Sequence, residues 1–209
     1  MTPSWAGSDL RPMFGPVRDQ GQRPTCLSFA ASAVHEHARG LLAPLSTEAL
    51  HQASKARDGL PSDAATTVGA MLASLQTEGQ CDESEWPYGT GQPTAIAGAF
   101  LMAESGLRTR SLLGEMVASS IAGGSSVLIV LQLTTGWFAV GADGRVPGPS
   151  PVDAFAGYHA VVAVGSDAPA ELVLFRNSWG DLWGDRGYGQ VSHDYLATYG
   201  VEALTLEPL

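Results

Sequence analysis

The stretch TCLSFAASAVHEHARGLL, residues 25–42, predicts a helix with a cysteine at its start. Pro24 and Thr25 are residue types that helix starts favour. The apolar face of this helix, at helical spacing, consists of Leu27, Ala30, Ala31, Val34 and Ala38. Because most of these side chains are small, we expect another layer of the protein to pack closely against the helix.

Around this helix, the chain changes from helical patterns to strand patterns. Further helices are predicted over residues 46–57, 67–78, 96–103 and 112–121. Strands are predicted over 106–111, 126–133, 136–141, 159–167, 171–178 and 186–192, and SDAPA joins the fourth and fifth of them as a hairpin. Helices followed by strands indicate the α+β class, with a helical lobe and a β lobe.

The composition is that of a globular protein with an acidic surface. The chain has 209 residues, of which 44% are hydrophobic and 15% charged, which suits one domain or two small lobes. Its net charge of -10 disfavours nucleic acids and anionic membranes as partners. The longest apolar run, Val127–Leu131, is far below the ~18 residues of a membrane span. The first residues lack a secretory signal, so we expect a cytoplasmic protein, or one delivered by a signal-independent route.

Cys26 is the candidate nucleophile. At a helix start, the partial positive charge of unpaired backbone N–H groups favours the reactive thiolate. Gln20, in PVRDQG, can donate its side-chain amide to an oxyanion, with the Cys26 N–H as second donor. Taken alone, a cysteine on an alanine-rich helix is more often a small buried apolar residue. The other cysteine, Cys81, precedes the acidic run DESE, which would raise its pKa, so we interpret it as an unreactive and reduced thiol.

His159 and Asn177 complete the candidate catalytic set. A histidine at a strand start can face a nucleophile across a cleft and exchange its proton near neutral pH. Asn177, in FRNSWGDLWGDRGYG, can accept a hydrogen bond from His159, and Trp179 can cover that bond and exclude water. Each residue also has an ordinary interpretation, as a partly buried histidine and as a turn asparagine.

Together these motifs resemble the papain and cathepsin family of cysteine peptidases. PVRDQGQRPTCLSFA is similar to the family's segment around the oxyanion glutamine and nucleophilic cysteine, YHAVVAVG to its histidine strand, and RNSWGDLWGDRGYG to its asparagine motif. The resemblance implies a papain-like two-lobe fold with a cleft between the lobes, as one catalytic domain over residues 1–209. A helical left lobe would span about 12–111, and a β-barrel-like right lobe about 112–209 plus the N-terminal segment.

The resemblance also implies an activity, the hydrolysis of peptide bonds in a protein or peptide substrate. The implied catalytic residues are Cys26, His159, Asn177 and Gln20, and the implied substrate-binding or supporting residues are Trp179, Tyr158 and Gly157. Neither a metal nor a cofactor is implied. The chain begins almost where the family's mature enzymes begin, so control by a regulatory protein partner, lobe closure or restricted access is left open.

The chain also departs from the family pattern. Arg23 stands where the family usually has a second cysteine, Leu27 replaces a tryptophan, and GLPSDAATT replaces the loop that grips the substrate. The family's usual disulfides are therefore absent, and its specificity cannot be carried over. Three alternatives stay open: an acyl transferase or deamidase, a catalytically silent peptide-binding module, and a defence or effector protease with a single target.

Other polar residues predict no second site. His35 and His37 point to different faces of a helix and make a poor metal pair. His51 and His193 are predicted to lie at the surface. No G-x-x-x-x-G-K-[ST] pattern supports nucleotide binding.

Overall fold

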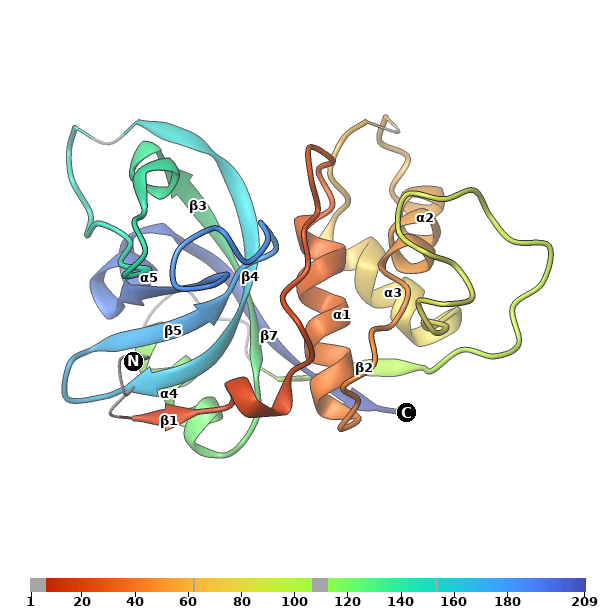
Figure 1. The fold of residues 1–209 in the computed structure, drawn as a ribbon, viewed down its shortest axis with the longest axis horizontal. Helices are drawn as coiled ribbons and strands as arrows, with labels where there is room; N and C mark the ends of the chain where they lie inside the picture. Colours follow the sequence, from red (N-terminus) through yellow and green to blue (C-terminus); the bar gives the residue numbers. More distant parts are fainter. Residues whose placement is uncertain (1–6, 62, 107–112, 153) are drawn as a thin grey trace.

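Three helices of the described chain and most of its sheet lie in two different halves (Figure 1). The computed structural model describes residues 7–61, 63–106, 113–152 and 154–209. Figure 1 shows α1 (Cys26–Ala38), α2 (Thr47–Asp58) and α3 (Val68–Thr77) on one side and a curved sheet on the other, with α4 (Leu113–Ala122) and α5 (His193–Tyr199) on the sheet side. The α+β class predicted from the sequence is therefore confirmed. Within the described ranges, no helix is both long and apolar enough to cross a membrane.

Seven strands form one antiparallel sheet, and its described ladder is an open path. In spatial order the strands are β2 (Met102–Gly106), β7 (Gly200–Pro208), β3 (Val127–Thr134), β4 (Phe155–Asp167), β5 (Leu172–Arg176) and β6 (Tyr188–Ser192). The short β1 (Ser8–Asp9) pairs with β4, so the start of the described chain lies on the sheet half. The predicted hairpin is confirmed, because β4 and β5 pair antiparallel with Asp167 opposite Leu172.

The sheet separates two hydrophobic cores. Along β3, Ile129 and Leu131 belong to one core and Leu128 to the other, because successive side chains of a strand point to opposite faces. The first core lies against α4 (Leu113–Ala122) and α5 (His193–Tyr199), and the second against α1 (Cys26–Ala38) and α3 (Val68–Thr77). Burial on both faces explains why β3 is apolar from Val127 to Leu131.

Helix α1 stands directly against the sheet, as its small side chains predict. It contacts β4 and β7 on one side and α2 (Thr47–Asp58) and α3 on the other (Figure 1). The helix ends at Ala38, before the predicted Leu42, because the chain turns at Gly40 with a φ of 67°. Glycine adopts this left-handed conformation at little cost. Helix α2 begins where predicted, with the Ser46 side chain accepting a hydrogen bond from the Ala49 N–H.

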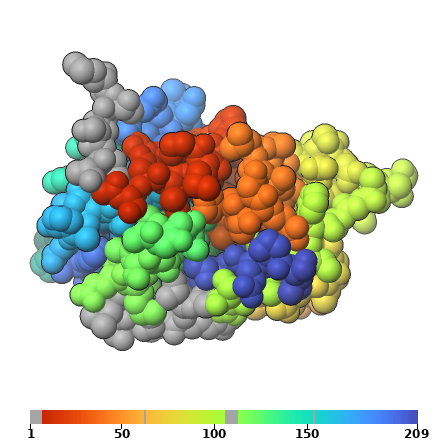
Figure 2. Space-filling model, turned by 90° about the horizontal axis from the view of Figure 1, so that it is seen from below, coloured from red at the N-terminus to blue at the C-terminus, as the bar shows by residue number. Residues whose placement is uncertain are grey.

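The C-terminal strand connects the two halves. β7 pairs with β3 inside the sheet and with β2, which packs against α3. Figure 2 shows the last residues, in blue, beside orange residues from the first helices and green residues from the middle of the chain. Strand β7 thus contacts both the sheet, through β3, and the helical half, through α1 and β2.

Two of the predicted elements are wrong. Residues 96–103 contain no helix, because the chain instead enters β2 at Met102 and pairs with β7. Residues 136–141 form no strand, because Thr135–Ala139 forms the 3-10 helix η2 and buries Trp137 in the first core. The strand predicted over 106–111 lies almost wholly outside the described residues. A second 3-10 helix, η1 (Arg11–Met13), together with α5 and β7, was not predicted.

Candidate active site

Cys26 is the first residue of α1 and lies where the helical half meets the sheet. Burial raises the pKa of its thiol, while the backbone amides of Ala160, Leu27 and Cys26 itself lower the pKa by less. The helix start therefore favours the thiolate as expected, but burial outweighs it, and the net direction is opposite to the sequence-based prediction. Ala160 follows His159 in β4, so the sulfur lies against the strand that carries the candidate base.

His159 and Asn177 form the hydrogen bond expected from the sequence. The His159 Nε2 lies 2.7 Å from the Asn177 Oδ1, and both residues are buried. Because the same Oδ1 also accepts the Ser178 N–H at 2.8 Å, the oxygen is an acceptor and His159 Nε2 carries a proton. The neutral ring therefore has its lone pair on Nδ1, which leaves Nδ1 as the basic atom. Burial lowers the pKa of His159 to about 4, although the bond to Asn177 raises it somewhat.

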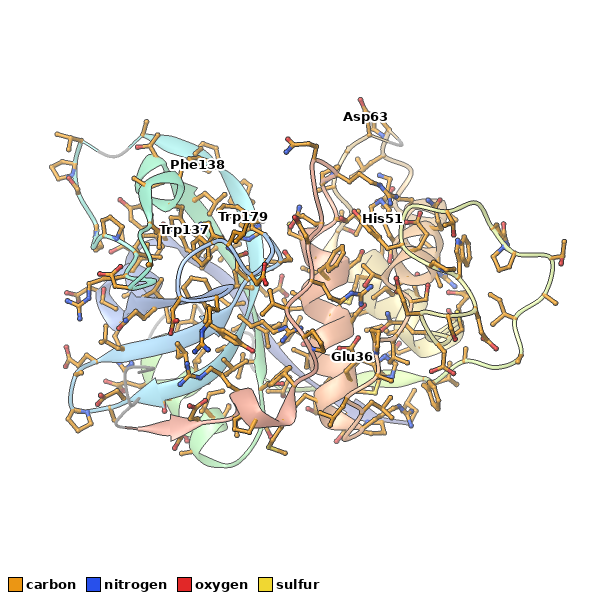
Figure 3. The ribbon with its side chains drawn as sticks, in the orientation of Figure 1. Glu36, His51, Asp63, Trp137, Phe138 and Trp179 are labelled. Atoms are coloured by element: carbon orange, nitrogen blue, oxygen red, sulfur yellow. The ribbon has the colours of Figure 1, made fainter. Side chains whose placement is uncertain are left out.

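Aromatic rings cover this pair. Trp179 lies 4.7 Å from the His159 ring between centroids, and Trp137 meets His159 edge-on at 6.0 Å. Figure 3 shows Trp137, Phe138 and Trp179 together on the sheet half, with Trp179 nearest the helical half. The position of Trp137 is fixed by a hydrogen bond, because its Nε1 donates to the Tyr195 hydroxyl at 2.7 Å. The rings surround the histidine with apolar surface, which is the cause of its low pKa.

Gln20 joins the helical half to the asparagine segment. Its backbone N–H donates to the Ser178 carbonyl at 2.8 Å, and its Oε1 accepts the Ser178 hydroxyl at 2.7 Å. Its Nε2 donates one hydrogen to the Arg23 carbonyl at 2.8 Å. A side-chain amide has two such hydrogens, so the second is available to another acceptor.

The structure brings the four predicted catalytic residues into one connected group. Cys26 contacts the amide that follows His159, His159 binds Asn177, and Gln20 binds the residue after Asn177. Of the predicted supporting residues, Trp179 packs on His159, whereas Tyr158 is 62% exposed beside it on β4. Gly157 has a φ of 134° at the start of the same stretch. The catalytic roles of all these residues stay predictions.

Ser178 is a member of this group that sequence reasoning missed. It links Gln20 to Asn177 through its backbone and its hydroxyl. The sequence contains a signal for it, because Ser178 directly follows Asn177 in RNSWG and its hydroxyl can form a hydrogen bond with a neighbouring segment. The histidines beyond the site need one correction: His51 is buried, not at the surface, and its Nδ1 lies 3.4 Å from the Ser28 hydroxyl. His193 is only partly exposed.

Cys81 is buried, and its thiol is free like that of Cys26. Its pKa is raised, as predicted, but burial is the main cause, and the nearby carboxylates of Glu85 and Asp82 add to it. No group of three or more metal-ligating side chains occurs in the parts of the chain that the structure describes.

A buried carboxylate lies behind the site. Glu36, on α1 (Figure 3), lines a cavity of about 20 Å³ together with Arg18, Arg176 and Asn177. Burial raises the pKa of Glu36 to about 7, although the Leu45 N–H and the two arginines lower it. Its carboxylate accepts the Leu45 N–H at 2.9 Å and lies 3.6 Å from Arg18.

We expect Glu36→Gln to remove a pH-dependent contribution to stability. A carboxyl whose pKa rises on folding stabilises the fold fully below its unfolded value of 4.5, and this stabilisation is lost as the pH rises through 7. At about 1.4 kcal/mol per unit, the loss amounts to about 3 kcal/mol. Urea unfolding of both proteins across this range should show the wild type losing that much relative to Glu36→Gln. Parallel curves would contradict the assignment, and Glu78→Gln, at a half-exposed carboxyl, is the control.

Comparison with known proteins identifies the family. The family model described as "Papain family cysteine protease" matches residues 5–209. Cathepsin J of Mus musculus is 27% identical over 208 residues, covering 92% of this chain and 61% of the relative. Cysteine proteinase 3 of Entamoeba histolytica is 25% identical over 193 residues, covering 89% of this chain and 62% of the relative. The chain therefore spans less than two thirds of the length of these two relatives.

The fold has solved counterparts. Xylellain, a cysteine protease from Xylella fastidiosa, superimposes with a TM-score of 0.82 at 21% identity, covering 97% of this chain and 85% of that chain. This likeness confirms the papain-like fold expected from the motifs. Because the family model matches nearly the whole sequence, this chain belongs to the papain family of cysteine proteases.

Proposed function

We propose that this protein hydrolyses peptide bonds in a protein or peptide substrate through a thioester on Cys26. One observation carries the proposal: His159 Nε2 is held by Asn177 Oδ1 at 2.7 Å, and the backbone amide directly after His159 lowers the pKa of the Cys26 thiol. A nucleophile, a base and an orienting group in series are what the proposed reaction needs. Gln20 and the Cys26 N–H supply two donors for an oxyanion.

The reaction consists of two acyl transfers. His159 Nδ1 takes the thiol proton as the sulfur attacks the carbonyl carbon, and the carbonyl oxygen becomes an oxyanion held by Gln20 and the Cys26 N–H. The C–N bond then breaks while His159 gives its proton to the leaving nitrogen. A water molecule next gives a proton to His159 and attacks the thioester. The C–S bond breaks, the sulfur regains the proton, and the acid product leaves.

The pKa directions are compatible with this sequence of steps. Burial raises the pKa of Cys26 and lowers the pKa of His159, so each group alone resists its charged form. Transfer of one proton from sulfur to imidazole creates both charges together and leaves the net charge unchanged. The two charges then stabilise each other at short range, where the surroundings screen them poorly.

Product mapping tests the proposal against its rivals. Peptide pools are incubated with wild type and with Cys26→Ala, and new termini are identified by mass spectrometry. New termini that require Cys26 support a peptidase. A deamidase or acyl transferase would change the mass of intact peptides without cutting them. A silent binding module would give no covalent product, and an electrophilic probe would not label Cys26 in preference to Cys81.

The aromatic surface beside His159 predicts a substrate preference. His159 gives its proton to the leaving nitrogen, so residues after the cleaved bond lie on its side, where Trp179 packs. Phe138 stacks on Trp179 at 5.9 Å between centroids and is 66% exposed. This pair therefore offers an apolar platform to the leaving side of the substrate.

We expect Phe138→Ala to lower kcat/KM about fivefold for peptides with an aromatic residue directly after the cleaved bond, since one aromatic contact contributes about 1 kcal/mol. Peptides with glycine at that position should change by less than about twofold. The check is a pair of fluorogenic peptides that differ only there. An equal loss on both peptides would show that Phe138 does not select this residue.

A further inference from the structure

An ion pair occupies the place where the family pattern has a cysteine. Arg23, between Gln20 and Cys26, forms a two-pronged pair with Glu48, with N–O distances of 2.5 and 2.9 Å. Glu48 lies in the first turn of α2 and its side chain is only 3% exposed, whereas the Arg23 side chain is 36% exposed, so the carboxylate is the partner that is shielded from water. Glu48 also accepts the Gly89 N–H and the Gln52 amide. The carboxylate is therefore fully satisfied and cannot shift without breaking several bonds.

The backbone of Arg23 connects this ion pair to Gln20. The Arg23 carbonyl accepts the Gln20 Nε2 at 2.8 Å, and it also accepts the Thr25 N–H at 2.8 Å. Arg23 is therefore bound to α2 through its side chain, and its backbone carbonyl holds the Gln20 amide. The same carbonyl also fixes the residue just before Cys26.

Tyr88 makes a second connection between these residues. Its hydroxyl donates to the Gln20 carbonyl at 2.8 Å and lies 2.7 Å from the Thr25 hydroxyl. The Arg23 guanidinium lies over the Tyr88 ring at 4.7 Å. Tyr88 belongs to the loop after α3, so this loop and α2 both converge on residues 20–25.

We infer that Arg23, Glu48 and Tyr88 are positioning residues that aim the Gln20 amide at the oxyanion. The Arg23–Glu48 ion pair and the Tyr88 hydroxyl together form a clamp that holds residues 20–25 without a covalent bridge. This inference rests on the proposed function, because it assigns a purpose to the Gln20 donor. The consequence is specific: loosening the clamp lowers the rate of acyl transfer through Gln20. It leaves the intrinsic reactivity of the Cys26 sulfur unchanged.

Two variants loosen the clamp with little risk to folding. Tyr88→Phe removes only the hydroxyl and keeps the ring against Arg23 and Phe29. The double change Arg23→Gln, Glu48→Gln replaces the ion pair with two neutral amides that can still bind each other, so no buried charge is left alone. Arg57→Gln is the matched control. Arg57 lies on α2, like Glu48, and forms an exposed ion pair with Glu78.

Two readouts separate positioning from a structural role. Peptide hydrolysis needs the oxyanion donors, whereas alkylation of Cys26 by iodoacetamide forms no oxyanion. We expect kcat to fall about tenfold in the double variant and about threefold in Tyr88→Phe, with KM and the alkylation rate within about twofold of wild type. Arg57→Gln should leave all three values unchanged. An alkylation rate that falls in parallel with kcat, or an unchanged kcat, would overturn the inference.

A double-mutant cycle with Gln20→Ala makes the test decisive. Loss of an oxyanion donor costs about 10²–10³ in kcat. If the clamp acts through Gln20, adding either clamp variant to Gln20→Ala lowers kcat no further. Fully additive losses would overturn the inference while leaving the peptidase proposal intact. A wild-type protein that cuts no peptide would overturn both.

Discussion

Cys26→Ala is expected to lower peptide hydrolysis by about 10⁴-fold or more, down to the background of the assay. The substitution removes the only atom that forms the acyl bond in the proposed mechanism, and no neighbouring group can replace it. The fold should persist, because alanine is a good helix former and Cys26 is the first residue of α1. The measurement is kcat/KM on a cleaved peptide, with circular dichroism and a melting curve to establish folding.

Cys81→Ala is the matched control for this change. Both residues are free thiols in the helical half, but Cys81 is buried away from His159 and hydrogen-bonds Ser46. Its replacement should cost some stability through the small cavity that it leaves, with kcat nearly unchanged. If purified Cys26→Ala kept substantial activity, or if Cys81→Ala lost activity while remaining folded, the assignment of the nucleophile would be wrong.

The sequence predicted those parts of the fold that depend on local patterns. The helix starts at Ser46 and Thr67 carry side chains that cap them, and both caps are made. The hairpin of β4 and β5 follows from two apolar runs around a short polar turn. β7 could not be found in this way, because its pairing with β2 and β3 depends on residues about 70 to 106 positions away. The apolar run GWFAVG predicts a strand, but tertiary packing buries Trp137 and the chain forms the 3-10 helix η2 there instead.

In the candidate site too, local motifs are predictable from the sequence, whereas features that depend on long-range packing are not. Motif spacing pointed to Cys26, His159 and Asn177, and the bond between the last two has the expected partners. The charge state was not readable from the sequence, because burial of Cys26 outweighs the N–H groups at the helix start. The sequence shows Arg23 only as a departure from the family's cysteine, because its partner Glu48 lies 25 positions away in α2. The cytoplasmic location and the regulatory partner stay predictions.

His159→Ala is expected to lower kcat about as much as Cys26→Ala, and the double variant Cys26→Ala, His159→Ala should be no slower than either single variant. Nucleophile and base act as one unit, so removing the second member after the first has no further effect. Alkylation of Cys26 by iodoacetamide should also slow strongly in His159→Ala at neutral pH, because no neighbouring base can then take the thiol proton. Peptide hydrolysis and alkylation are the two measurements.

The pH profile of the wild type gives an independent check on His159. The pair must hold one proton in total, since the base has to be free to accept the proton of the thiol. Below the His159 pKa of about 4, a second proton binds and activity is lost, so kcat/KM should rise with pH through this value. On the alkaline side the pair loses its single proton only above the ordinary thiol value, because burial raises the pKa of Cys26. An acid limb near 6.5, the ordinary histidine value, would show that the ring is not buried as the structure places it, and that the aromatic cover of Trp179 does not shield it.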